Sequence, residues 1–455
     1  MLVPKVGRAR IDTLDVLRGI AILLIFVLNI PWMGNTLYHF HADPRLLGWS
    51  PADQFYWWFQ SIALAGTQRG ILQLLFGAGA VILLERTMRH DGPVEVADLY
   101  FRRNLWLMFF GLVDIFALFW VGDILLIYSI AALFLFPIRR LGPRTLITLA
   151  LLCMLFSTAR GVVAYQRGER TQAAATQAAR KQAPGEPLDD SDRQVLATRA
   201  KSLALYHPPA EALAEERAAR SGAIAAYQHW LSSFFLDKLL VAFYPTFIFE
   251  AFSTMLLGMG LFKLGILQGA RAPRFYLALA LLAYIPGLAA RALGCWQQTD
   301  FQASPHVEMF TGPLSRVAVT LGHVAVINLL MKGRVGQALL APFKAVGRTA
   351  FSLYLMQNFL GMWVLFSGFG LGLWGRFGWS RLAMIALAVM AAQLILANVW
   401  TSAFAVGPLE WVWRSLAYLK IQPFRHRPVE PDDRGVDGLG PEELVASRTG
   451  PGGTG

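Results

Sequence analysis

The sequence predicts an all-α protein: a polytopic transmembrane helix bundle of about ten spanning helices, with both termini in the cytoplasm. Two observations predict this fold class. Hydrophobic residues make up 55% of the 455 residues and charged residues only 15%, which is too apolar for a water-soluble domain with a polar shell. The charges also collect in short clusters between long apolar runs, as loops do between membrane spans.

A spanning helix needs about 20 largely apolar residues, because the hydrocarbon core is about 30 Å thick. This rule places spans at residues 14–34, 68–86, 101–120, 122–138, 143–165, 240–262, 274–293, 309–331, 347–370 and 381–404. Only Val121-Gly122-Asp123 joins the third span to the fourth, so we expect a tight hairpin there. The first run is long and follows Lys5, Arg8 and Arg10, which indicates a retained span rather than a cleaved signal.

The distribution of basic residues orients the bundle. With the N-terminus inside, the cytoplasmic segments contain Arg89, Arg139, Arg140, Lys263, Arg271, Arg274, Lys332, Arg334, Lys344, Arg414, Lys420, Arg425 and Arg427. The short outside loops carry only Arg45 and Arg376, and this asymmetry is what the positive-inside rule predicts. Because the basic residues are dispersed over loops, the net charge of +12 does not call for a nucleic-acid partner.

Four regions follow from this layout. Residues 1–165 hold the first five spans, and residues 239–421 hold the last five. Between them, residues 166–238 are polar and helix-prone, and we expect an extracytoplasmic insert of short helices. Residues 422–455 are rich in Pro, Gly, Arg and Asp, which predicts a disordered cytoplasmic tail. The aromatic-rich segment 53–66 suits an interfacial helix.

Two residues of the first span have a spacing that favours ligand binding. Asp15 and Arg18 lie three positions apart, on one face of the helix, where they can form an ion pair or grip a ligand together. Arg18 is suited to a phosphate or carboxylate, which its guanidinium can bind by a bidentate fork. The alternative is an ion pair near the cytoplasmic interface that fixes the depth of the helix.

Ionisable residues inside spans are costly and indicate a polar cavity or a buried partner. Asp114 and Glu250 are such residues. Glu250 suits either a proton or cation pathway or a buried Arg–Glu pair. Asp123 precedes an apolar run, so it is either a helix N-cap or a functional carboxylate. The chain lacks phosphate-loop, His-Glu-x-x-His, Gly-x-Ser-x-Gly and zinc-spaced cysteine motifs, so we expect no metal site and no tightly bound cofactor.

Several motifs occur in the order found in one family. They are Asp15-x-x-Arg18-Gly19-x-Ala21, Leu75-Phe76-Gly77-Ala78-Gly79, Gly122-Asp123-Ile124-Leu125 with Tyr128, Gly347-Arg348-Thr349-Ala350, and Gly407-Pro408-Leu409-Glu410-Trp411 with Arg414. In these the chain resembles the YeiB-like family (DUF418) of multi-pass proteins of unknown function in the bacterial inner (cytoplasmic) membrane. Members often have a histidine shortly before the Gly-Asp-Ile-Leu motif, where this chain has Asp114.

The opening motif is also similar to that of a wider group of transmembrane acyltransferases, which includes heparan-α-glucosaminide N-acetyltransferase. There, a comparable helix ends in Asn and precedes an aromatic-rich outside loop with an essential histidine. Here Asn29 precedes Tyr38-His39-Phe40-His41, and the spacing does not choose between His39 and His41. The resemblance implies a histidine base oriented by Asp123, with Asp15, Arg18 and Asn29 binding acyl-CoA as co-substrate. Alternatively, both histidines are solvated loop residues.

Three functions remain open at this point. The first is an acyltransferase that moves an acyl group from a cytoplasmic acyl-CoA-type donor to an extracytoplasmic acceptor, a glycan or a small molecule with a hydroxyl or amine. The second is a secondary transporter, suggested by Asp114, Glu250 and a faint echo of Leu75–Gly79 in Leu257–Gly260. The third is a non-catalytic envelope scaffold that uses the insert. The lipid bilayer is a partner in each case, and the oligomeric state is open, with a homodimer as one option.

Overall fold

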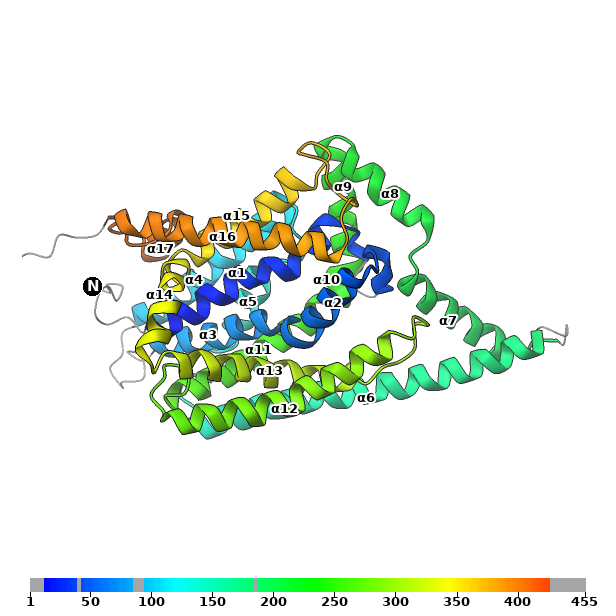
Figure 1. Cartoon of the computed structure of the whole chain (residues 1–455), viewed down its shortest axis with the longest axis horizontal. Coiled ribbons are helices and arrows are strands. Elements are labelled where there is room, and N and C mark those ends of the chain that lie inside the picture. The colour runs from blue at the N-terminus through cyan, green and yellow to red at the C-terminus, as the bar shows by residue number, and fades with distance from the viewer. Residues whose placement is uncertain (1–11, 39–41, 85–93, 183–186, 426–455) are drawn as a thin grey trace, which may run out of the picture.

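The computed structural model describes residues 12–38, 42–84, 94–182 and 187–425, which form an all-α bundle (Figure 1). Apart from one isolated antiparallel bridge between Phe404 and Arg425, these ranges contain no β structure. The predicted fold class is therefore confirmed.

The first part of the chain forms α1 (Asp12–Gly34), α2 (Pro51–Phe59), α3 (Thr67–Leu84), α4 (Val94–Phe116), α5 (Leu125–Leu133) and α6 (Pro143–Gln182). The middle part forms α7 (Asp190–Tyr206), α8 (Ala210–Ser221), α9 (Ile224–Phe234) and α10 (Leu240–Ala242). The last part forms α11 (Tyr244–Lys263), α12 (Pro273–Gln298), α13 (Glu308–Leu330), α14 (Arg334–Arg348), α15 (Ala350–Phe359), α16 (Trp379–Ala403) and α17 (Pro408–Tyr418). Short π-helical segments extend α2 over Gln60–Leu64 and α15 over Leu360–Leu365.

Within the described ranges, seven helical stretches are long and apolar enough to cross a membrane. They are Asp12–Gly34, Pro51–Leu84, Pro143–Gln182, Tyr244–Lys263, Pro273–Gln298, Glu308–Leu330 and Trp379–Ala403, and each contains most or all of one predicted span. The other three predicted spans fall on α4, α5 and Ala350–Leu365, of which α5 has only 9 residues. The long apolar helices establish a membrane protein, and the count of ten spans stays a prediction.

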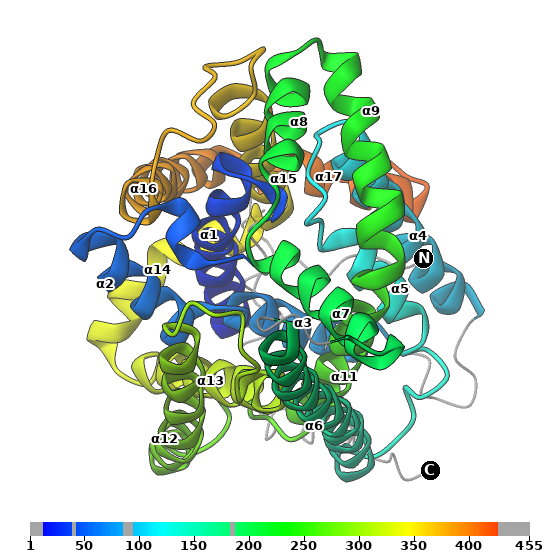
Figure 2. The ribbon, with the colours of Figure 1, turned by 90° about the vertical axis from the view of Figure 1, so that its right-hand side faces the viewer.

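Close helix contacts in the bundle depend on glycines. Gly19 of α1 lies against the carbonyl oxygen of Phe343 in α14, and Gly347 of α14 lies against that of Asp15, so a Cβ at either glycine would overlap backbone. Gly77 of α3 and Gly258 of α11 pack in the same reciprocal way. The faint echo between Leu75–Gly79 and Leu257–Gly260 thus coincides with a small-residue contact between two helices. Looking along the bundle, α1 lies near its centre, while α6, α12 and α16 lie at its edge (Figure 2).

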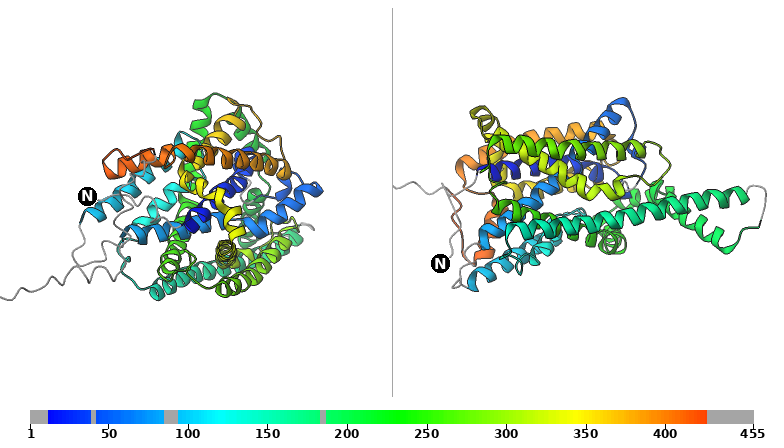
Figure 3. Two further views of the ribbon diagram at one scale, coloured as in Figure 1. Left: turned by 60° about the vertical axis from the view of Figure 1, so that its left-hand side comes forward. Right: turned by 90° about the horizontal axis from the view of Figure 1, so that it is seen from below.

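The region predicted as an insert of short helices begins with a long one. α6 is continuous over 40 residues and ends at Gln182 instead of near residue 165. Its sequence after residue 165 is rich in alanine and has no proline before Pro184. The high helix propensity of this segment explains why the helix continues past the predicted end of the span. α7 packs back on α6, and this pair projects beyond the rest of the bundle (Figure 3). α8 and α9 then lead the chain back to α11.

Two segments were predicted not to span the membrane, and the structure describes the whole of the aromatic segment and the first residues of the tail. The aromatic segment near residues 53–66 is helical, begins with a reciprocal cap between Ser50 and Asp53, and exposes Phe55. At the other end, the Phe424 carbonyl accepts a hydrogen bond from the Ala405 amide, and the Gln422 carbonyl accepts one from Trp411. The predicted disordered tail therefore begins with a few residues held against the bundle, and residues 426–455 lie outside the described ranges.

Candidate functional site

Asp15 and Arg18 form the expected pair on α1. Arg18 Nη1 lies 2.8 Å from Asp15 Oδ1 and 3.4 Å from the Gly347 carbonyl oxygen. The Asp15 side chain is 9% exposed, whereas that of Arg18 is 35% exposed. The opening motif and the Gly347-Arg348 motif are therefore one structural unit, and Arg18 still has a face that a ligand can reach.

Two further arginines belong to this end of the bundle. Arg103 of α4 lies within electrostatic range of Arg18 and stacks over the Trp413 ring, with its Cζ 4.6 Å from the ring centroid. Arg348 follows Gly347 directly, and its Nε is buried without a hydrogen-bond partner among the described residues. We call Arg18, Arg103 and Arg348 the inner arginine cluster.

The structure does not bring Asn29 to this cluster. Asn29 lies three helical turns beyond Arg18 on α1, about 16 Å away along the helix axis. Its Nδ2 is buried and has no hydrogen-bond partner in the described part of the chain. A role for Asn29 in donor binding, as the resemblance implies, would therefore concern a different part of the donor from the one at Arg18.

His39 and His41 lie outside the described residues, but both flanks of their segment are anchored by the insert. On the near side, Glu216 of α8 accepts hydrogen bonds from Thr36 Oγ1 at 2.5 Å and from the Leu37 amide at 3.1 Å. On the far side, the Asp43 amide donates to the Tyr206 carbonyl of α7 at 2.9 Å. Glu216 is fully buried and is also paired with Arg220 at 3.0 Å.

Asp123 is fully buried, and the structure brings it next to Asp114. Asp123 Oδ2 accepts a hydrogen bond from the Leu126 amide at 2.6 Å, and Oδ1 accepts one from Tyr354 at 3.1 Å. The first of these bonds holds the first turn of α5, but the N-cap residue of that helix is Ile124, so Asp123 acts from one position before the cap. Asp114 accepts a hydrogen bond from Asn358 at 2.7 Å. Whether Asp123 also orients a histidine stays a prediction.

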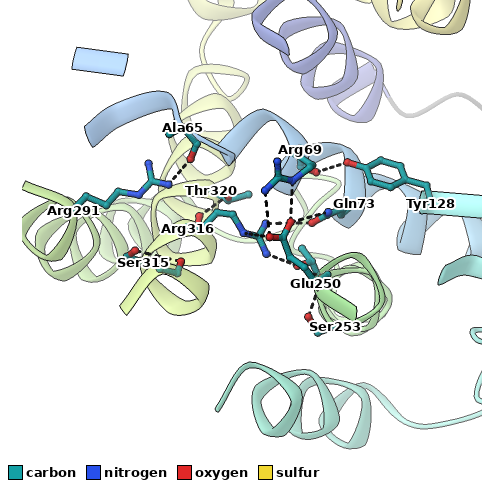
Figure 4. A network of polar contacts seen from close by, with 12 residues as sticks. Ala65, Arg69, Gln73, Tyr128, Glu250, Ser253, Arg291, Ser315, Arg316 and Thr320 are labelled. Carbon is teal, nitrogen blue, oxygen red and sulfur yellow. Dashed lines mark hydrogen bonds and ion pairs between the residues drawn. The ribbon is translucent and has the colours of Figure 1, made fainter. Parts of the chain in front are cut away.

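Glu250 lies between two arginines, so the described contacts match the Arg–Glu pair that was one of its two expected roles, although this pair is only partly buried (Figure 4). Arg69 of α3 grips it with a bidentate fork, with Nε at 2.9 Å and Nη2 at 3.2 Å from its two oxygens. Gln73 donates to the same carboxylate at 3.2 Å. Arg316 of α13 approaches it less closely, with Nε at 3.5 Å.

A break in the helical stretch Pro51–Leu84 lies beside this pair. The chain leaves its helical path at Ala65 and Gly66, where Gly66 has φ +73°, before α3 starts at Thr67. Arg291 of α12 donates to the freed carbonyls of Ile62 and Ala65, and His323 of α13 contacts that of Ala63. Side chains from two other helices thus form hydrogen bonds with the backbone carbonyls that the break leaves without helical partners.

The sequence reasoning missed Arg69, Arg291 and Arg316, although a usable signal was present. Arg291 and Arg316 lie inside predicted spans and Arg69 near the start of another, so the rule that singled out Asp114 and Glu250 applies to them as well. Within the described ranges, no group of three or more His, Cys, Asp or Glu is placed to hold a metal ion.

Comparison with known proteins gives relatives over almost the whole chain. The family model described as "Protein of unknown function (DUF418)" matches residues 261–420. The chain is 30% identical over 442 residues to the uncharacterized protein YxaH of Bacillus subtilis (strain 168), covering 93% of this chain and 98% of the relative. It is 24% identical over 421 residues to the uncharacterized protein YeiB of Escherichia coli (strain K12), covering 90% and 97%. No solved structure matches.

Proposed function

The chain belongs to the DUF418 family of proteins of unknown function, and we propose that it is an acyltransferase that carries an acyl group across the bilayer. In this proposal a cytoplasmic acyl-CoA-type donor binds at the inner arginine cluster. A hydroxyl or amine of an extracytoplasmic acceptor receives the acyl group. The observation that carries the proposal is the inner arginine cluster itself, in which Arg18 pairs with Asp15 and still remains 35% exposed.

The charge balance of the cluster supports a phosphate-bearing ligand. Arg18 pairs with Asp15, Arg103 lies within electrostatic range of Arg18, and Arg348 follows the residue whose carbonyl Arg18 contacts. Arginines at the membrane boundary favour anions that accept two hydrogen bonds at once. Glu410 contacts the chain just after Arg348 but is already engaged there, because it accepts hydrogen bonds from the amides of Phe351 at 2.6 Å and Ser352 at 3.3 Å. Donor phosphates would supply the missing negative charge.

The proposed reaction is an ordinary acyl transfer. The acceptor oxygen or nitrogen attacks the thioester carbonyl carbon, a new C–O or C–N bond forms, and the C–S bond breaks. The acceptor proton passes to His39 or His41, and the departing thiolate takes up a proton. Histidine suits this step because its ordinary pKa lies near neutrality. The insert anchors the described residues on both sides of these histidines, namely Thr36 and Leu37 before them and Asp43 after them.

Donor binding is the direct test. We expect the purified protein in detergent to bind acetyl-CoA by calorimetry, and Arg18→Gln to weaken this binding at least tenfold, because one charge-assisted fork is lost. Arg193→Gln is the matched control, since it removes an arginine from an exposed pair in α7. Absence of acetyl-CoA binding by folded wild-type protein would count decisively against the proposal. Equal transfer activity in the His39→Ala/His41→Ala double variant would remove the proposed base.

A secondary transporter is the second candidate, and the broken helix beside Glu250 favours it. Discontinuous helices with buried charges at the break are common at transporter binding sites. We expect, on this alternative, flux of a small anion into proteoliposomes that Glu250→Gln abolishes while Arg193→Gln leaves it intact. Flux that is equal in all three proteins would argue against it.

A further inference from the structure

The arginine–glutamate group around the broken helix carries more positive than negative charge. We call Arg69, Arg316 and Glu250 the outer arginine site (Figure 4). It joins α3, α11 and α13, which are distant in sequence, and Arg69 and Glu250 are 181 positions apart. Arg291 lies alongside but is bonded to backbone carbonyls and also has Glu308 within electrostatic range.

Arg316 is the incompletely compensated member of this site. Its side chain is 7% exposed, and among the residues that the structure describes its one carboxylate contact is the 3.5 Å approach to Glu250. Its other donors go to neutral groups, Gln73 Oε1 at 3.2 Å and Thr254 Oγ1 at 3.0 Å. Its Nε makes no hydrogen bond within the described residues. A buried guanidinium without a full counter-charge is expensive, so a further anion would be stabilised here.

The first turn of α3 adds to the positive potential. A Cβ on Gly66 would lie 2.9 Å from Arg316 Cδ, and one on Gly70 would lie 3.2 Å from Arg316 Nη1, so the guanidinium rests directly on this turn. The N-terminal end of an 18-residue helix carries a partial positive charge and favours anions. Two guanidinium groups, one of them resting on the first turn of α3, thus share the single carboxylate of Glu250.

The resident carboxylate is also the more reachable part of the site. The side chains of Glu250 and Arg69 are 21% and 27% exposed, well above Arg316. Glu250 can therefore rotate toward its exposed side and leave the two guanidinium groups to another anion. Two such groups on one ligand are typical of carboxylate and phosphate recognition.

We propose that the outer arginine site binds the carboxylate or phosphate group of a ligand, in place of Glu250. Glu250 is then a tethered counter-ion, which keeps the arginines compensated while the site is empty and competes with the ligand. This inference does not rest on acyl transfer, because its site shares no residue with the inner arginine cluster. The anionic group can come from a soluble molecule or from a lipid headgroup, and the experiment separates these sources.

The test measures thermal stabilisation of the full-length protein in a neutral detergent at constant ionic strength. The probes are sodium phosphate, sodium acetate and micelles doped with phosphatidylglycerol, each against sodium chloride. We expect at least one probe to stabilise the wild type in a saturable way. A response to phosphate or acetate identifies a soluble ligand, and a response to phosphatidylglycerol alone identifies a lipid headgroup.

The variants decide whether the response belongs to this site. Glu250→Gln removes the competing carboxylate and should bind the probe several-fold more tightly than the wild type. Arg316→Gln should weaken binding at least tenfold, and Arg316→Lys should give an intermediate loss, because it keeps the charge without the fork. Arg193→Gln should bind as the wild type does.

Two results would overturn the proposal. One is a wild type and a Glu250→Gln variant that respond to every probe as they do to chloride. The other is an Arg316→Gln or Arg69→Gln variant that folds and retains wild-type affinity. If the arginine variants fail to fold, Glu250→Gln still decides. The proposal requires this variant to bind the probe more tightly than the wild type, because the competing carboxylate has been removed.

Discussion

Both arginine groups sit at helix contacts, but they are held in different ways. In the inner arginine cluster, Arg18 pairs with Asp15 three residues earlier on the same helix and remains 35% exposed. In the outer arginine site, Arg69, Arg316 and Glu250 come from three helices, and Arg316 is only 7% exposed. A pair within one helix costs little to rearrange, whereas the outer arginine site is part of the packing. We therefore expect a ligand to bind the inner arginine cluster at little cost in protein stability. Binding at the outer arginine site should instead change the stability of the protein.

The sharpest way to break this comparison is to remove the carboxylate of the outer arginine site. Glu250→Leu leaves two guanidinium groups uncompensated, one of them the buried Arg316. We expect it to destabilise the protein by about 3 kcal/mol, at the lower end of what losing one partner of a buried pair costs, because Arg69 is partly exposed. Thermal unfolding in detergent measures the change. The Glu250→Leu/Arg316→Leu double variant should recover part of it, because one orphaned cation is gone. A cost below about 1 kcal/mol for Glu250→Leu would place this site among ordinary surface pairs.

The second change acts on the packing that supports the inner arginine cluster. Gly347→Leu would drive a side chain into the α1 backbone at Asp15, and we expect a loss of about 1–3 kcal/mol from overpacking. Because the Gly347 carbonyl accepts a hydrogen bond from Arg18, acetyl-CoA binding should weaken as well. Gly79→Leu is the matched control, since a side chain there meets nothing within 4 Å. Equal stability of the two variants would show that α1 and α14 are not held by this contact.

The two groups also differ in how well the sequence reveals them. The Asp15–Arg18 pair follows from helical spacing alone. The seven long apolar helices of the described ranges follow from the length of the apolar runs. The partners of Glu250 could not be assigned, because pairing across three helices depends on tertiary packing. The same holds for Asp114 near the end of α4, whose contact with Asp123, just before α5, also depends on how the chain folds between these two helices.

Glu410 gives a third arrangement, a carboxyl held by backbone amides at the start of α15. Burial raises the pKa of Glu410 above its ordinary value, and the hydrogen bonds from Ser352 and Phe351 only partly oppose this. Because the pKa of Glu410 is higher in the folded state than in the unfolded state, the unfolded chain loses the Glu410 proton first as the pH rises. Stability from Glu410 is therefore complete below the ordinary glutamate pKa and falls as pH rises through the higher folded-state value. Unfolding measured across that range should lose part of its pH slope in Glu410→Gln. An unchanged slope would assign the pH dependence to other groups.

The smallest effect on stability is expected at the inner pair itself. Asp15→Asn should change the free energy of unfolding by less than about 1 kcal/mol, because Arg18 is partly exposed and its charge is screened by water and salt. The same change should strengthen acetyl-CoA binding, since Asp15 no longer competes with phosphate for the guanidinium. Calorimetry at low and high sodium chloride checks both points, and added salt should weaken donor binding in the variant and the wild type alike. If Asp15→Asn instead costs as much stability as Glu250→Leu and leaves donor binding unchanged, the inner pair is a structural element, and the contrast between the two groups disappears.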